Sequence, residues 1–246
     1  MFVLTLQAAL AASVPDQLQA VAAYRSKRIA KDAPVVPPSA YETAAAGKIA
    51  TGVEYADGVA AGKGWAVAVS DVGIESLWMA MNAEDQYVGR FDGLTASAVL
   101  SGTAHGSPRV LFQSLDLPIV SDRWWVSLEQ FNAPLYTQSG GLVWECAWTD
   151  ATDPARVAGT PWADVAAAGV PVAWSKGAWL LIPLEDGRTV IEYFVWTDPG
   201  GRLPAGAATR FASGALDRSV RDLESLARDL APTSREGFVR PDGRPL

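Results

Sequence analysis

The sequence predicts an α+β domain in which an antiparallel sheet packs around a long C-terminal helix. Two observations lead to this fold class. About nine segments alternate apolar and polar residues or are rich in β-branched and aromatic residues, and turn signals separate them. A short helical pattern precedes most of these segments, and a long one follows them, which is typical of an α+β arrangement.

Residues 1–13 begin the chain with an apolar run that ends in Ala9-Leu10-Ala11, a sequence similar to a signal-peptidase site. The positively charged start of a signal peptide is missing, since the first basic residue is Arg25. We interpret residues 1–13 as a candidate signal peptide with a mature chain starting near Ala12, which slightly favours export. An apolar start to a helix is the alternative.

Residues 14–39 are predicted to form an N-terminal helix, started by Pro15 and Asp16, and a Pro-rich connector at 34–38 that leads onto the main domain. One side of the helix is expected to carry Leu18, Val21, Ala22, Arg25 and Ile29. A local basic group consists of Arg25, Lys27, Arg28 and Lys31. A solvated helix face is the favoured interpretation of this group, and contact with an anionic membrane is the alternative.

The next segments predict a hairpin that leads into a short helix. Strands at 47–56 and 63–70 are separated by Asp57-Gly58 and Gly62. Ser70 or Asp71 is expected to cap the helix, whose apolar positions follow the helical period at Ile74, Leu77, Trp78 and Met81. Residues 82–93 are polar and are predicted to form a loop.

The middle of the chain predicts further strands. Residues 95–104 and 109–117 flank a turn at 105–108, and a strand from Arg123 follows. Alternation places five of its residues on one face: Arg123, Trp125, Ser127, Glu129 and Phe131. A strand at 140–149 and a loop at 150–169 come next. Strands at 170–175 and 178–184 are predicted to pair across Lys176-Gly177.

The last elements are a strand at 188–197, a sharp turn and a long helix. Pro199 fixes one backbone dihedral of the turn, and Gly200 and Gly201 accept positive φ. The helix is expected over Leu203–Leu230, because apolar residues recur there at spacings of three and four. These residues are Phe211, Ala215, Leu216, Val220, Leu223, Ala227 and Leu230.

Two stretches resemble the START family of lipid-transfer domains, in the helix-grip (SRPBCC) superfamily, bacterial-type. One runs from Trp179-Leu180-Leu181-Ile182 through the turn at 198–204 to the closing helix, and the other is Asp122-Arg123-Trp124-Trp125. Trp124 stands where an acidic residue is more usual. The resemblance implies a curved antiparallel sheet that grips the C-terminal helix around an apolar tunnel. It covers residues 40–230, so we assign 40–232 to the lipid-binding domain and 233–246 to a C-terminal tail.

Composition excludes several function classes. The net charge of −7 and pI near 4.8 have the wrong sign for a phosphate backbone, so nucleic acid is not an expected partner. A single cysteine allows no intramolecular disulfide and no thiolate metal site. Hydrophobic residues make up 49%, with ten Trp, which fits either a cavity lined by apolar groups or a thick core. No stretch after the N-terminus reaches the ~18 to 20 apolar residues of a membrane span.

No residue pattern predicts catalysis or a cofactor. The one histidine, His105, lies in a predicted turn and is interpreted as a solvent-facing turn residue. Cys146 lies in an apolar strand without neighbouring cations, which indicates an inert packed thiol. No nucleophile elbow, phosphate-binding loop or dinucleotide fingerprint is present. We therefore expect no enzyme activity, no metal and no cofactor.

Three carboxylates stand out because burial of an unpaired charge is costly. Glu145 and Glu192 lie in apolar strands, and Glu129 lies on the predicted inner face. The START resemblance implies a charged pair in the tunnel, with a basic group near the position of Glu129. A reversed pair of Glu129 with Arg109 on the preceding strand would preserve that chemistry, and a solvent-facing Glu129 is the alternative.

The predicted function is binding, with transfer, of one elongated apolar ligand such as a sterol, a fatty acid or a phospholipid, by a monomer that makes transient membrane contact. The expected ligand-binding residues are Arg109, Trp125, Ser127, Glu129, Phe131, Trp179, Tyr193, Phe211, Ala212, Ala215 and Leu216. Movement of the C-terminal helix or of the 150–169 loop is expected to admit the ligand. Two alternatives stay open: an enzyme similar to the polyketide aromatase/cyclases, and a structural domain with a filled core.

Overall fold

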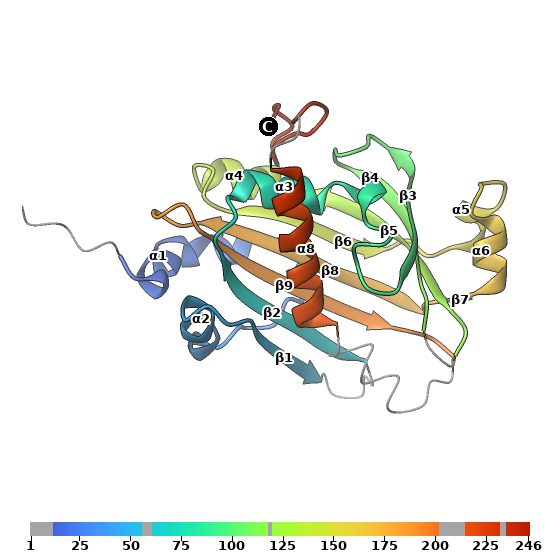
Figure 1. The fold of residues 1–246 in the computed structure, drawn as a ribbon, viewed down its shortest axis with the longest axis horizontal. Helices are drawn as coiled ribbons and strands as arrows, with labels where there is room; N and C mark the ends of the chain where they lie inside the picture. The colour runs from blue at the N-terminus through green and yellow to red at the C-terminus, as the bar shows by residue number, and fades with distance from the viewer. Residues whose placement is uncertain (1–11, 56–60, 118–119, 202–214, 232–234) are drawn as a thin grey trace, which may run out of the picture.

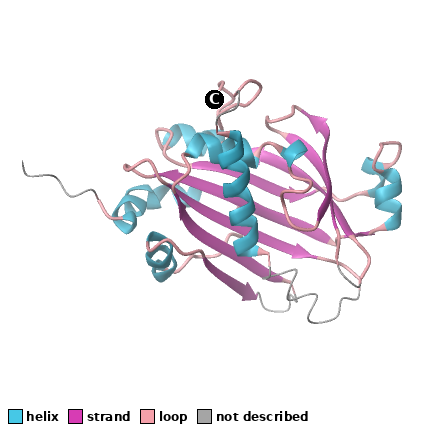
Figure 2. Cartoon of the chain, viewed as in Figure 1, coloured by secondary structure: helices cyan, strands magenta, loops and turns pink. Residues whose placement is uncertain are grey.

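A single curved antiparallel sheet organises the chain, as predicted (Figures 1 and 2). The computed structural model describes residues 12–55, 61–117, 120–201, 215–231 and 235–246. Within these residues the strand order is β1-β2-β9-β8-β6-β5-β4-β3, and β7 pairs with β5 in parallel. The strands are β1 (Ala50–Tyr55), β2 (Gly62–Ser70), β3 (Leu94–Gly102), β4 (Arg109–Leu115), β5 (Arg123–Phe131), β6 (Trp144–Asp150), β7 (Val170–Pro171), β8 (Trp174–Pro183) and β9 (Thr189–Asp198).

Helices cover both faces of the sheet. The α-helices are α1 (Val14–Val21), α2 (Pro38–Ala45), α3 (Ile74–Met81), α4 (Ala133–Gln138), α5 (Pro154–Val157), α6 (Ala163–Ala168) and α8 (Leu216–Leu230), and the 3₁₀ helices are η1 (Ala22–Lys27) and η2 (Glu84–Gln86). In the part of the chain that the structure describes, no helix is long and apolar enough to cross a membrane.

The concave face holds the main core, where α8 and α3 pack on the sheet (Figure 1). The buried side of α8 consists of Leu216, Val220, Leu223, Leu226 and Ala227, which includes four of the seven apolar positions expected from the helical period. Phe211 lies outside the described residues, and Ala215 is the exposed N-cap. The prediction that the sheet surrounds the C-terminal helix is confirmed for Leu216–Leu230.

The convex face is covered by the N-terminal segment, in a second core. Val14, Leu18 and Val21 of α1 pack with Ala40 and Ala44 of α2 against side chains of β2, β8 and β9. Residues 14–39 therefore form an integral layer of the domain, and their role exceeds the predicted connector. Alternation explains the two cores, because successive residues of one strand point to opposite faces.

The segment at 150–169, predicted as a loop, contains α5 and α6 and covers the convex face near β4 and β5. Val157 of α5 packs with Phe112, Trp124 and Val126 in a third core. These even-numbered strand residues face away from the concave side. This segment lies on the convex face, opposite α8, and its movement to admit a ligand stays a prediction.

Three local predictions also need correction. Residues 170–175 do not pair with 178–184: Trp174–Pro183 is one continuous strand, and Val170–Pro171 pairs with β5. The strand predicted at 140–149 begins at Trp144, and α4 lies before it. The N-cap of α3 is Gly73, with no side-chain hydrogen bond, so neither Ser70 nor Asp71 caps it.

The C-terminal segment packs onto α3. The backbone carbonyl of Val239 accepts a hydrogen bond from Trp78 Nε1 at 2.8 Å, and Arg240 forms an ion pair with Glu75 at 2.7 Å. Val239 and Leu246 also contact the main core. The described part of the tail, 235–246, is thus docked against the domain.

Candidate functional site

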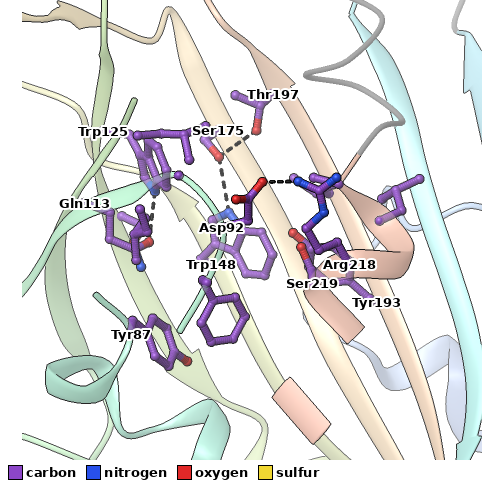
Figure 3. A pocket seen from close by; sticks show the side chains of 18 of the residues that line it. Tyr87, Asp92, Gln113, Trp125, Trp148, Ser175, Tyr193, Thr197, Arg218 and Ser219 are labelled. Carbon is purple, nitrogen blue, oxygen red and sulfur yellow. Dashed lines mark hydrogen bonds and ion pairs between the residues drawn. The ribbon is translucent and has the colours of Figure 1, made fainter. Parts of the chain in front are cut away.

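A cavity of about 330 Å³ lies between the concave face of the sheet and the first turn of α8 (Figure 3). This volume is at the lower end of the range of roughly 300–1,000 Å³ that is common for small-molecule sites. Its apolar lining consists of Met81, Phe91, Leu94, Leu115, Leu117, Trp125, Trp148, Trp179, Val195 and Leu216. Most of the strand residues among them share the inward phase of the pleat, which is why aromatic rings from β5, β6 and β8 converge there, together with Tyr193 of β9.

Polar side chains in the cavity wall are largely hydrogen-bonded to each other. Trp125 Nε1 donates to Gln113 Oε1 at 3.1 Å, as Figure 3 shows. Trp148 Nε1 donates to Ser175 Oγ at 3.3 Å, and Ser175 Oγ lies 2.8 Å from Thr197 Oγ1. These bonds satisfy the polar atoms and leave the rings facing the cavity.

The solvent end of the cavity is formed by the segment before β3, the end of β4 and the start of α8. Asp92 and Arg218 form an ion pair there, with side chains 64% and 51% exposed (Figure 3). Slightly deeper, Tyr193 hydrogen-bonds Ser219 of α8, and burial raises the pKa of Tyr193 to about 12 while that bond opposes the shift. These contacts connect α8 to both sides of the opening.

Glu129 lies on the inner wall, and Arg109 lies behind it. The β4–β5 register places the two residues directly opposite each other, and Arg109 Nη2 donates to Glu129 Oε2 at 2.6 Å. The Arg109 side chain is 0% exposed, whereas that of Glu129 is 14% exposed and lines the cavity. The predicted reversed pair is confirmed.

A second carboxylate, Glu84 of η2, shares Arg109 with Glu129. Arg109 pairs with Glu84, donates to Asn82 Oδ1 at 2.8 Å and donates to the Gly106 carbonyl at 2.5 Å. Burial raises the pKa of Glu84 to about 8, against the opposing effect of Arg109. Burial also raises the pKa of Glu129, again against Arg109. With one cation for two carboxylates, the cluster favours retention of a proton.

Cys146 and His105 adjoin this cluster. Cys146 Sγ lies 3.8 Å from Glu129 Oε2, and burial raises the pKa of the thiol well above its usual value despite the nearby Arg109. The expectation that no cation is near Cys146 is wrong, but the raised pKa agrees with an inert thiol. His105 does lie in a turn, at φ 57°, yet its ring stacks on Phe238 and its Nδ1 bonds the Asn82 carbonyl, so it is only 23% exposed.

Ser127 has an unused polar group in the cavity wall. It follows Trp125 by two residues on β5, so both face the concave side. Its Oγ is buried and has no hydrogen-bond partner among the described residues. A buried hydroxyl without a partner costs free energy unless a ligand or water supplies one.

The other two predicted costly carboxylates, Glu145 and Glu192, lie on the convex face, where the N-terminal basic group pairs with them. Arg28 Nε donates to Glu145 Oε1 at 3.0 Å, and Arg25 makes two bonds to Glu192, at 2.8 and 2.5 Å. Burial opposes ionisation of Glu192, but the bonds to Arg25 lower its pKa. The interpretation of these arginines as a solvated face is therefore wrong.

The structure brings most of the predicted site residues together. Trp125, Ser127, Glu129, Trp179, Tyr193, Ala215 and Leu216 line the cavity. Phe131 faces the same side but packs on Trp78 at a ring distance of 4.7 Å, in the solid part of the core. Arg109 is screened from the cavity by Glu129. Phe211 and Ala212 lie outside the described residues.

The polar composition of residues 82–93 predicts only a loop and does not indicate that Glu84 and Asn82 belong to the site. Both are buried, at 2% and 0% exposed. Their position directly after a helix with a continuous apolar face was the available signal. No group of His, Cys, Asp or Glu in the described ranges could hold a metal ion.

Comparisons with known proteins identify the fold. No protein-family model matches the sequence, and no curated protein does. A STAR-related lipid transfer protein fragment from Xanthomonas axonopodis matches with a TM-score of 0.59 and 15% identity, over 73% of this chain and 93% of that one. Human STARD10 matches with a TM-score of 0.61 and 13% identity, over 87% of this chain and 80% of that one. Human StAR-related lipid transfer protein 5 matches with a TM-score of 0.58 and 14% identity, over 88% of this chain and 98% of that one.

These likenesses and the strand order show that the chain has the helix-grip fold of START domains. At such low identities they show the fold alone.

Proposed function

We propose that this protein binds a lipid or another apolar small molecule in the cavity between the sheet and α8. The observation that carries the proposal is the cavity itself, whose wall combines converging aromatic rings with few polar groups. Ligand sites commonly have this composition, in which apolar area supplies affinity and a few polar atoms fix orientation. The lipid-transfer proteins with the same fold support the same class of ligand.

The cavity volume supports a ligand with one chain or a compact ring system. The cavity has a volume of about 330 Å³, so it would have to open further to hold a two-chain phospholipid. A carrier must also release its cargo. Among the described residues, α8 is linked to the opening by the ion pair of Arg218 with Asp92, by Asp222 Oδ2, which accepts from the Asp92 backbone N–H at 3.2 Å, and by the contact of Ser219 with Tyr193. Opening of the N-terminal turn of α8 is the step we propose for ligand access.

A carrier is favoured over an enzyme. Among the described lining residues, Glu129 is the one carboxyl in the inner wall, and Arg109 and Cys146 engage it. General acid–base catalysis on a ring-forming substrate needs several positioned proton donors and acceptors. His105, the usual candidate, is bonded to the Asn82 carbonyl and does not line the cavity. A cavity of this size also favours binding over a purely structural role.

The test is a titration of the purified protein with a fluorescent sterol and a fluorescent fatty acid. The wild type is expected to show saturable binding to at least one of them. Ala215→Trp, at the cavity edge, should weaken that binding about ten-fold or more, because the ring fills volume the ligand needs.

The matched control is Ser225→Trp, which places the same ring on the exposed side of α8, away from the cavity. It should bind as the wild type does, and both variants should keep its melting temperature within a few degrees. Equal binding by all three proteins would remove the cavity as the site. Absence of saturable binding by the wild type would leave the structural alternative.

A further inference from the structure

The inner wall of the cavity presents a carboxylate, and its cation is withdrawn. Glu129 lines the cavity, whereas Arg109 is fully buried behind it and does not. The Nη donors of Arg109 point to Glu84, Glu129, Asn82 and the Gly106 carbonyl, and its buried Nε has no hydrogen-bond partner among the described residues. An anionic ligand head would therefore meet the carboxylate of Glu129 and not a guanidinium.

One oxygen of Glu129 remains available to a ligand. The bond from Arg109 and the contact with Cys146 both use Oε2. Within the described part of the chain, Oε1 has no hydrogen-bond donor, and the side chain is 14% exposed toward the cavity. With the proton of the cluster on Glu84, Glu129 is the ionised partner of Arg109, and its free oxygen accepts hydrogen bonds only, so its complement is a donor.

Ser127 supplies a second and independent polar contact. It lies two residues before Glu129 on the same face of β5, roughly 7 Å away along the strand. Ser127 lines the cavity and is 1% exposed. Its hydroxyl has no hydrogen-bond partner among the described residues. A ligand head between these side chains could donate to Glu129 and either accept from or donate to Ser127 Oγ.

Negative charges also outnumber positive ones elsewhere in the described wall. Asp92 and Asp116 line the solvent end, and Arg218, which is the one cation among the described lining residues, is paired with Asp92. A negatively charged ligand thus finds no unpaired cation in the described wall. Like charges in a poorly solvated site repel strongly, which gives selection against such a ligand.

We propose that Glu129 and Ser127 make this cavity selective for apolar molecules whose head donates a hydrogen bond, a hydroxyl or a protonated amine, and reject carboxylates and phosphates. The inference rests on the proposed function, since it assumes that the cavity binds an apolar ligand. It adds the class of head group and the residues that read it.

The test uses three ligands with the same chain and different heads: dodecanol, dodecylamine and dodecanoate. Each competes at pH 7, below its micelle concentration, with the neutral fluorescent probe Nile red bound to the full-length protein. Dodecanol or dodecylamine should displace the probe at a concentration about ten-fold or more below that of dodecanoate. Which of the two is better distinguishes an alcohol site from an amine site.

Two variants assign the selectivity. Glu129→Gln removes the charge at nearly constant volume and should reduce the preference over dodecanoate to about two-fold or less. Ser127→Ala should weaken binding of dodecanol a few-fold. Dodecanoate should still bind poorly to this variant, because Glu129 is intact. An unchanged preference in folded Glu129→Gln would overturn the assignment.

The failures of the two proposals are distinguishable. If dodecanoate matches or exceeds the other ligands on the wild type, or if Nile red binds and none of the three displaces it, the head-group inference is overturned. If neither Nile red nor any of the three binds, the proposed function fails. The wild-type series decides the inference even if Glu129→Gln does not fold.

Discussion

At the scale of single residues, the chain places four carboxylates within apolar surroundings and neutralises them with three arginines. Glu129 and Glu84 share Arg109, Glu145 has Arg28, and Glu192 has Arg25. The sequence predicted the pair of Glu129 and Arg109 because adjacent strands fix their register. It could not predict the pairs to Glu145 and Glu192, since their partners lie more than a hundred residues away, at separations of 117 and 167.

Because Glu84 and Glu129 share Arg109, loss of the arginine should destabilise the fold more than loss of one carboxylate. Arg109→Met should lower the free energy of unfolding by about 3 to 5 kcal/mol, because it strands Glu84 and Glu129 together. Glu129→Gln should cost only about 1 kcal/mol, because Glu84 then releases its proton to neutralise Arg109 and the amide oxygen accepts the Arg109 hydrogen bond. Urea denaturation of both variants measures the difference. Equal costs would show that the two carboxylates do not depend on one cation.

The raised pKa of Glu84, about 8, has a consequence for stability against pH. Between about pH 4.5 and pH 8 the folded protein holds this proton while the unfolded chain releases it, so stability falls as pH rises through that window. Glu84→Gln cannot lose the proton. Relative to this variant, the wild type should become progressively less stable from pH 5 to pH 8, as measured by thermal or urea unfolding at each pH. A constant or increasing relative stability would contradict the buried, protonated Glu84.

At the scale of elements, alternation and helical period predicted most strands and the buried side of α8. These patterns did not predict the short helices. Helix α4 was missed although Asn132 caps it, accepting from the Leu135 backbone at 3.1 Å, with a proline in its first turn. Helices α5 and α6 have only four and six residues, too few for a hydrophobic period to show. The convex layer was missed because a sequence does not say which strand face an amphipathic helix covers.

The layer formed by α1, η1 and α2 should contribute to folding through Arg28. Arg28→Met leaves Glu145, whose side chain is 0% exposed, with the backbone N–H of Ile29 and the Asn132 amide as donors. The expected loss is about 3 kcal/mol. Lys27→Met, an exposed neighbour bonded to Gln138, is the matched control and should cost less than about 0.5 kcal/mol. Equal melting temperatures for the two variants would show that the N-terminal layer is a loosely attached segment.

At the scale of the whole molecule, residue patterns predicted an antiparallel sheet around a C-terminal helix, whereas the cavity between them was implied only by the START resemblance. Residue composition fits a cavity and a filled core equally well, and the difference depends on how large side chains interlock. Here Trp78, Phe131 and Trp144 fill one end of the concave face, while Trp125, Trp148 and Trp179 stand around open space at the other. That division follows from packing in three dimensions, which no spacing rule encodes.

The most direct measurement of the central claim is native mass spectrometry of the wild-type protein and Ala215→Trp, purified from the same cells without added lipid. Binding of one apolar ligand in the cavity predicts a mass excess equal to a single molecule on part or all of the wild-type protein, extractable into organic solvent and reduced in Ala215→Trp. Ser225→Trp should retain the same excess. A wild type that carries no ligand and takes up none from an added sterol, long-chain alcohol, long-chain amine, fatty acid or phospholipid would contradict the account.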